Sequence, residues 1–382
     1  MRPTLRQTLV CALMLCGALV GATAVDARSL GAAAAAFKVQ TTPALRAAGG
    51  SLQAVTALST TDAWSVGSSI DHFDGASWSA AAAVAGGGSL ADVSSLTMDN
   101  IWAAGTLGAA PLVEHWNGRM WTQVQTPTLS GQTAAFNSIL ALSPTNVWGA
   151  GAAATTLILP LFEHWNGKVW TVVASPNVSG FIQKLAGTGA NDIWAVGYTT
   201  SFPAKPLIEH FNGTHWQQIT APFAGIGGQL FGVVALSTTN AWAVGFTTLA
   251  QVGNPLQIFN SPVQTLIEHW DGQRWQVVQS PNIGTPSVFQ RNVLYGIAAL
   301  SATDVWTAGQ FQLPDGSGSQ LTLALHWDGV TWSIAPTVDV GLAAGFRGVG
   351  VAQPSTVFLV GTGAFGGGLP VTAPLIAATS GG

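Results

Sequence analysis

Short runs of alternating hydrophobic and polar residues, separated by turn-forming residues, follow one another from Leu52 towards the C-terminus. The run LIEHWDGQRWQVVQSPN at Leu266–Asn282 shows the pattern, with two apolar runs on either side of an Asp-Gly pair. Alternation with a period of two predicts strands, and Asp-Gly between two such runs predicts a hairpin with a two-residue type I′ turn, in which both turn residues have positive φ. The same frame recurs at Leu112–Pro127, Leu161–Asn177, Leu207–Pro222 and Leu325–Pro336.

A second hairpin frame alternates with the first one. It reads LFGVVALSTTNAWAVG at Leu230–Gly245, where a Ser/Thr/Asn turn separates two apolar runs and the second run is centred on Trp. Ser, Thr and Asn favour turns because their side chains bond to the nearby backbone. One repeat therefore contains four strands, a to d. The aromatic residue of strand b marks each copy and stands at Trp64, Trp102, Trp148, Trp194, Trp242, Trp306 and Phe358.

The length of the repeat predicts the architecture. Successive strand-b aromatics are 38 to 64 residues apart, and four short strands per repeat of about 40–50 residues are typical of a β-propeller blade. The last copy, residues 346–379, lacks a strand d, whereas Phe37–Pro43 (FKVQTTP) matches the strand-d frame Trp275–Pro281 (WQVVQSP). We therefore predict an all-β, seven-bladed β-propeller of four-stranded antiparallel blades, with blade 7 split between 37–43 and 346–379 so that the N-terminal strand closes the ring.

The repeat also resembles that of secreted bacterial β-propeller repeat proteins, whose units read ALSxTDVWAVG…EHWDGxxW. The resemblance covers residues 37–379 and implies a seven-bladed propeller but no particular activity. The Gly-His…Trp-Asp order of WD repeats is absent from these copies. The Ser-x-Asp-x-Gly-x-x-Trp box of sialidase-like propellers is absent as well, so the catalytic residues of those enzymes are not carried over.

The N-terminal segment has the features of an export signal. Arg2 and Arg6 precede the apolar run Leu9–Val20, and Ala22-Thr23-Ala24 follows it as a small-residue cleavage site. We therefore predict a signal peptide at 1–24, a linker at 25–36 and the propeller at 37–382. Both cysteines of the chain lie inside the predicted signal peptide. The mature chain is expected to be secreted or at the cell surface and to have no membrane span.

Charge narrows the range of partners. Only 7% of the residues are Asp, Glu, Lys or Arg, against an ordinary share of about 25%. Without residues 1–24 the chain has 10 Lys and Arg against 16 Asp and Glu, a net charge of −6. This balance argues against a nucleic-acid partner, which needs a basic footprint. We also expect a monomer.

The candidate acid–base residues follow the repeat. All four glutamates stand at one place in strand c, and a histidine follows at the next position in six copies: Glu114, Glu163, Glu209, Glu268; His72, His115, His164, His210, His269, His326. A catalytic or metal site is needed once, whereas packed sheets keep equivalent positions about 10 Å or more apart. We therefore expect no catalytic residue, metal or cofactor, with the histidines hydrogen-bonded between blades or to a turn and the tryptophans packed between blades.

A binding site is expected where the copies differ. The a–b and c–d turns are short and similar, whereas the b–c and d–a loops, on the opposite rim, vary widely in length. Function tends to lie on variable loops held by a rigid scaffold. The candidate residues come from loops 246–265, 283–292, 198–206 and 310–322 and are Asn254, Gln257, Phe259 and Asn260; Phe289 and Arg291; Tyr198 and Phe202; Phe311 and Asp315.

Aromatic, amide and guanidinium groups suit a carbohydrate or protein partner. The sequence thus favours a secreted, non-catalytic propeller that binds an extracellular glycan or protein through the b–c/d–a loop face. The alternative is a propeller hydrolase or lyase that acts on polysaccharide at the central channel mouth. A structural or adhesive module without a small ligand is a third possibility.

Overall fold

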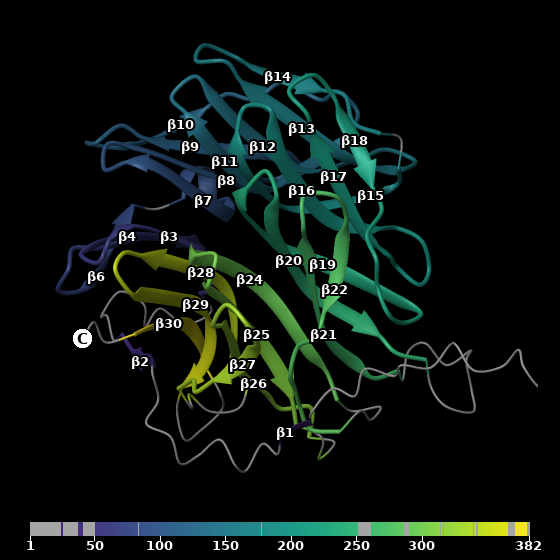
Figure 1. Ribbon diagram of the computed structural model, residues 1–382. Coiled ribbons are helices and arrows are strands. Elements are labelled where there is room, and N and C mark those ends of the chain that lie inside the picture. The colour runs from purple at the N-terminus through teal and green to yellow at the C-terminus, as the bar shows by residue number, and fades with distance from the viewer. Residues whose placement is uncertain are drawn as a thin grey trace, which may run out of the picture.

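In the computed structural model the described residues form seven four-stranded antiparallel sheets and one two-stranded parallel sheet (Figure 1). The structure describes residues 24–25, 37–40, 50–82, 84–176, 178–250, 261–285, 290–313, 315, 317–338, 340, 343–365 and 371–379. The predicted signal peptide and linker therefore lie outside the described residues, except for Ala24–Val25. These two residues form β1, which pairs in parallel with β23 (Asn282–Ile283).

Each blade follows chain order from strand a to strand d. Blades 1 to 3 consist of β3 (Leu52–Ser59), β4 (Asp62–Gly67), β5 (Ile70–Phe73) and β6 (Trp78–Ala82); β7 (Ser89–Thr97), β8 (Asn100–Leu107), β9 (Ala110–Trp116) and β10 (Trp121–Val124); and β11 (Thr133–Ser143), β12 (Asn146–Ala154), β13 (Ile158–Trp165) and β14 (Trp170–Val173). A short 3₁₀ turn, η3 (Ala85–Gly87), joins blades 1 and 2.

Blades 4 to 6 repeat this order. They consist of β15 (Gly180–Gly189), β16 (Asp192–Thr199), β17 (Pro206–Phe211) and β18 (Trp216–Ile219); β19 (Gly227–Ser237), β20 (Asn240–Thr248), β21 (Val263–Trp270) and β22 (Trp275–Val278); and β24 (Asn292–Ser301), β25 (Asp304–Gln312), β26 (Gln320–Trp327) and β27 (Trp332–Ala335). No helix among the described residues has the length and hydrophobicity that a membrane crossing requires.

Blade 7 is completed by the N-terminal part of the chain. Its strands a to c are β28 (Gly345–Ala352), β29 (Thr356–Phe365) and β30 (Val371–Thr379), and β2 (Phe37–Val39) pairs antiparallel with β30 as strand d. The Phe37 side chain is 1% exposed and packs into the core between blades 6 and 7. The predicted seven-bladed ring and its closure by the N-terminal strand are confirmed.

Aromatic contacts link each blade to the next. The strand-b ring of one blade meets a strand-c or strand-d ring of the following blade, with ring centroids 4.8 to 5.7 Å apart at the shortest contact of each interface. At the closure, Phe37 takes the place of the strand-d tryptophan and lies edge-on to Trp306 at 5.5 Å. Phe358 of blade 7 contacts Phe73 and Trp78 of blade 1. The predicted packing of the aromatic rows between blades is thus confirmed.

The c–d turns differ from the prediction. Four residues separate the strands, as at Asn166–Val169, and only the glycine has a positive φ, +93° at Gly167. The prediction of a two-residue type I′ turn was wrong because the Asn166 side chain forms hydrogen bonds within the turn. Its Oδ1 accepts the N–H groups of Lys168 and Val169 at 3.0 and 3.1 Å. This Asx arrangement leaves the first turn residue at negative φ.

Candidate functional site

The repeated histidines belong to the scaffold. In six blades the histidine Nε2 lies 2.8 to 3.0 Å from Oδ1 of the Asp or Asn that begins strand b, and the imidazole ring lies against the strand-b tryptophan of its own blade. The predicted hydrogen bond to a turn residue is confirmed. Burial lowers the pKa of His115, His164 and His269, which favours the neutral ring.

The glutamates of strand c point the other way and are buried. Glu163, Glu209 and Glu268 are 0% exposed, and their carboxyl oxygens have no hydrogen-bond partner among the described residues. Burial raises the pKa of Glu163 to about 7 and that of Glu209 to about 8, and it raises the pKa of Glu268 well above the usual value. Glu114 differs because its Oε1 accepts the Ala85 N–H at 2.9 Å. These groups lie inside the blades.

Each strand a has a β-bulge near its d–a end. At this end the register against strand b slips by one residue, so that one residue per blade stands outside the pairing there: Gln53, Ala91, Asn137, Gln183, Phe231, Tyr295 and Arg347. All seven are partly exposed, and neighbouring strands a pack against one another around the centre of the ring. A bulge re-aims the extra side chain. The bulges therefore give each blade one side chain at the centre that can vary without changing the register of its sheet.

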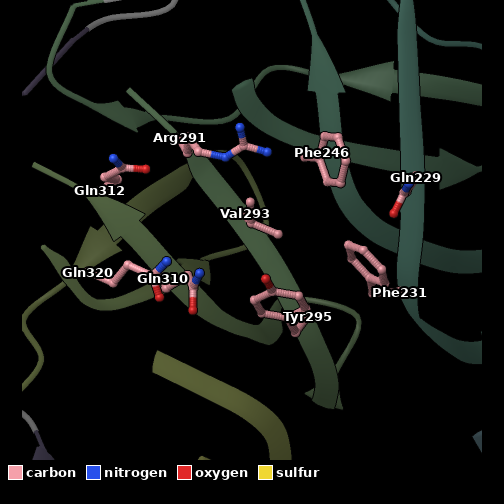
Figure 2. A pocket seen from close by; sticks show the side chains of 9 residues that line it. All are labelled: Gln229, Phe231, Phe246, Arg291, Val293, Tyr295, Gln310, Gln312 and Gln320. Atoms are coloured by element: carbon pink, nitrogen blue, oxygen red, sulfur yellow. The ribbon is translucent and has the colours of Figure 1, made fainter. Parts of the chain in front are cut away.

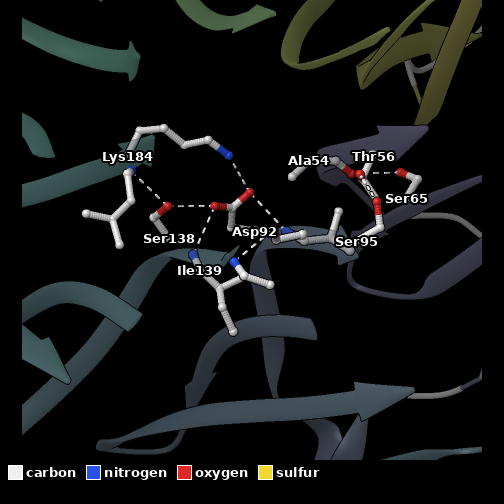
Figure 3. A network of polar contacts seen from close by, with 12 residues as sticks. Ala54, Thr56, Ser65, Asp92, Ser95, Ser138, Ile139 and Lys184 are labelled. Atoms are coloured by element: carbon white, nitrogen blue, oxygen red, sulfur yellow. Dashed lines mark hydrogen bonds and ion pairs between the residues drawn. The ribbon is translucent and has the colours of Figure 1, made fainter. Parts of the chain in front are cut away.

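Polar side chains bind blades 2, 3 and 4 together at the centre (Figure 3). Asp92 is 1% exposed, and its carboxylate accepts the Ser138 hydroxyl at 2.7 Å, the Ile139 N–H at 3.0 Å and the Lys184 ammonium at 2.5 Å. Ser138 in turn accepts the Leu185 N–H at 3.0 Å. This network uses the donors and acceptors of three neighbouring strands a.

Blades 5, 6 and 7 have glycine at the equivalent positions, directly after the bulge. A Cβ at Gly232 would lie 2.8 Å from the Tyr295 carbonyl oxygen, and one at Gly296 would lie 2.9 Å from the Arg347 carbonyl oxygen. The strands a of this half therefore approach each other through backbone. Glycine has no side chain that could join them, and the bulge residues Phe231, Tyr295 and Arg347 are the bulky groups.

A cavity of about 380 Å³ opens between blades 5 and 6 in this half (Figure 2). Residues at the d–a ends of β19 and β24, the b–c ends of β20 and β25 and the start of β26 line it: Gln229, Phe231, Phe246, Arg291, Val293, Tyr295, Gln310, Gln312 and Gln320. The cavity thus lies on the b–c/d–a face on which we expected a site.

Four glutamine amides line this cavity without a hydrogen-bond partner among the described residues. The side chains of Gln229, Gln310, Gln312 and Gln320 form no hydrogen bond within the part of the chain that the structure describes. Each amide offers two donors and one acceptor. Phe231 contacts both Phe246 and Tyr295, with ring centroids 5.9 and 5.1 Å apart. The cavity therefore combines aromatic walls with unused amide groups.

The charged groups at the cavity are guanidinium groups. Arg291 is exposed and lines the cavity. The guanidinium carbon of Arg347 lies 4.0 Å from the centroid of the Tyr295 ring, a cation–π contact. Neither arginine forms an ion pair with a described carboxylate. Among the described residues there is also no group of three or more His, Cys, Asp or Glu that could hold a metal ion.

The structure places the predicted site residues unevenly. Arg291 lines the cavity, and Tyr198 lies next to it, with its ring centroid 6.2 Å from that of Phe231. Phe202 is 70% exposed in the β16–β17 loop, and Asp315 lies in the β25–β26 loop; neither is among the residues that line the cavity. The remaining candidates, Asn254, Gln257, Phe259, Asn260 and Phe289, lie outside the described residues.

Phe311 is a correction to the predicted site. Its side chain is 5% exposed and belongs to the hydrophobic core between blades 5 and 6. Residue 311 lies in β25 and not in a loop, so its side chain points opposite to those of Gln310 and Gln312, which face the cavity. The residues that sequence reasoning missed lie on strand ends. The signal in the sequence that distinguishes this half of the ring is the glycine in the triplets FGV, YGI and RGV of blades 5 to 7. The corresponding triplets of the other copies have no glycine.

Comparison with known proteins supports the fold. No protein-family model matches the chain, and no curated protein matches it. Solved structures do match. The structure of YCF48 bound to D1 peptide is 15% identical, with 94% of this chain and 98% of that chain covered and a TM-score of 0.54. The WD40 β-propeller domain of Doa1 is 11% identical, with 89% and 97% covered and a TM-score of 0.56. At these identities the likeness shows the β-propeller fold alone.

Proposed function

We propose that this protein is a secreted, non-catalytic binding module that takes up an extracellular glycan in the cavity between blades 5 and 6. The observation that carries the proposal is the set of four glutamine amides that face the cavity without a partner in the described structure. Amides that both donate and accept hydrogen bonds match sugar hydroxyls, which do the same. The resemblance of the repeat to secreted bacterial propellers and the predicted signal peptide support the extracellular location.

A glycan suits the cavity better than a peptide does. A peptide that binds by strand addition needs a free sheet edge. β20, β25 and β26 are interior strands of their sheets, and the inner edges of β19 and β24 pack against strands a of neighbouring blades. Recognition here rests on side chains. The volume of about 380 Å³ lies within the range of small-molecule sites, about 300–1,000 Å³.

The test is a glycan array probed with the purified protein, followed by calorimetry on the glycans that bind. The double variant Gln312→Ala/Gln320→Ala should weaken binding about 25-fold, because each neutral hydrogen bond contributes about 1 kcal/mol, about fivefold in affinity. Gln123→Ala is the matched control, since Gln123 is an exposed glutamine on β10, the outer strand of blade 2.

Two results would count against the proposal. Protein that binds no sugar but captures a peptide or a surface protein would be a peptide-binding or protein-binding module; YCF48, a propeller of similar fold, is seen with a peptide bound. Turnover of a polysaccharide or ester panel by the purified protein would overturn the non-catalytic assignment and favour the hydrolase or lyase alternative.

A further inference from the structure

Resting on the proposed function, we propose that the glycan is acidic and that Arg291 binds the carboxylate of a uronic-acid unit in the cavity. Two guanidinium groups lie at the cavity, and the amides around them are neutral. The carboxylate is the chemical group by which the site would distinguish an acidic glycan from a neutral one.

The charge at the cavity differs in sign from the net charge of the chain. The full chain has 12 Lys and Arg against 16 Asp and Glu, so its net charge is negative. The strands that line the cavity carry Asp304 and His326, but these lie at the opposite rim and bond to each other at 2.9 Å. Asp315, in the β25–β26 loop, accepts the Ser317 N–H at 2.9 Å and forms no ion pair with Arg291 or Arg347 in the described structure. The cavity is therefore a local positive site on an acidic protein.

Arg291 has hydrogen-bond donors that are available to a ligand. Its guanidinium is exposed at the cavity and pairs with no described carboxylate. The planar guanidinium group binds a carboxylate through two parallel hydrogen bonds, a geometry that a neutral hydroxyl does not use. The surrounding glutamine amides are uncharged, so they leave the charge of Arg291 available to a ligand.

Arg347 and Tyr295 support this arrangement from the adjoining bulges. The Arg347 guanidinium is held over the Tyr295 ring at 4.0 Å, and Tyr295 itself lines the cavity. Arg347 thus adds a second positive charge beside the cavity while one of its faces is committed to the ring. We assign direct contact with the carboxylate to Arg291 and a charge-supporting position to Arg347.

The experiment compares acidic oligosaccharides with their neutral methyl esters. Calorimetry with the purified protein would use tetragalacturonate, tetraguluronate and a hyaluronan tetrasaccharide, each as the free acid and as the methyl ester. We expect at least one acid to bind about 10- to 100-fold more tightly than its ester, since a charge-assisted hydrogen bond is worth more than a neutral one. Arg291→Gln should remove most of this difference and lower the salt dependence of binding, of which the Arg347 charge supplies the rest. Arg274→Gln, a change at an exposed arginine of the β21–β22 turn on the other rim, should leave both unchanged.

The outcomes separate the two proposals. If the esters or neutral glycans bind as tightly as the acids, or if Arg291→Gln keeps the preference for the acid, the carboxylate assignment is wrong and glycan binding stands. If no saccharide on the array binds, both proposals fail together. Because Arg291 is exposed, its variant is expected to fold, and an unchanged melting temperature would check this.

Discussion

The buried carboxyl group of Glu209 allows a quantitative test of how the blades are packed. Its side chain is 0% exposed, and neither carboxyl oxygen has a hydrogen-bond partner in the described structure. Burial without compensation raises the pKa of Glu209 to about 8, against the ordinary value of 4.5. The folded state therefore prefers the protonated, uncharged acid.

The sign of the pH dependence follows from these two pKa values. Below about pH 4.5 the carboxyl group is protonated in both states and contributes nothing to the pH dependence. Between about pH 4.5 and 8 the unfolded chain releases its proton more readily, so the free energy of unfolding falls as pH rises, and above pH 8 the loss is complete. One pKa unit corresponds to about 1.4 kcal/mol, so the total loss is about 3 to 5 kcal/mol.

Glu209→Gln removes the titrating proton and keeps the shape of the side chain. Near pH 5 the stability of the variant should lie within about 1 kcal/mol of the parent, and near pH 9 the variant should be more stable by about 3 to 5 kcal/mol. Urea unfolding at several pH values measures both. Glu114→Gln is the control with a smaller expected gain, because the Glu114 carboxylate keeps a hydrogen bond from the Ala85 N–H. Parallel stability curves for parent and Glu209→Gln from pH 5 to 9 would refute the reasoning.

Two further predictions concern the centre of the ring. Gly296→Ala should destabilise the protein by about 1–3 kcal/mol, because the new Cβ would lie 2.9 Å from backbone atoms of blade 7; Gly189→Ala, with no atom within 4 Å of its Cβ, is the control in the same thermal unfolding assay. Asp92→Ala should cost about 2–4 kcal/mol, since it leaves the buried Ser138 hydroxyl and Ile139 N–H without their acceptor and takes the partner from the partly exposed Lys184 ammonium. A double-mutant cycle with Lys184→Met checks this, and additive effects of the two changes would contradict the coupling.

The fold could be predicted from the sequence because the same strand and turn pattern recurs in each blade. Each blade buries the same aromatic positions against the next blade, so the spacing of Trp64, Trp102 and their equivalents reports the blade length directly. The closure was also predictable, since Phe37 stands where other blades have the strand-d tryptophan and makes the same kind of contact. The turn type was not, because Asn-Gly also suits an Asx turn whose asparagine stays at negative φ.

The candidate site was predictable only as a face of the molecule. Loop length indicated the b–c/d–a rim, and Arg291 on that rim does line the cavity. The glutamines and aromatic residues that line the cavity were not predicted because they lie on strands, where the register decides whether a side chain faces the core or the cavity. Phe311 was misplaced because its register was not considered. It is a core residue, whereas Gln310 and Gln312, one position away on either side, line the cavity.

The position of the cavity follows from which residues occupy the strand-a bulges and the positions directly after them. A repeat protein needs nearly identical strands for its blades to pack, so residues inside the ladders have little freedom to differ. The bulge residue is outside the ladder and partly exposed, so it can differ from blade to blade with little loss of stability.

The residue directly after the bulge determines how neighbouring blades meet. Where it is Asp92, Ser138 or Lys184, side chains join neighbouring blades. Where that position is glycine, backbone packs against backbone, and large bulge residues such as Phe231 and Tyr295 form the wall of a cavity. The residue after the bulge therefore decides whether side chains join neighbouring blades, as in blades 2 to 4, or room is left for a cavity, as between blades 5 and 6, which is why we propose the ligand site there.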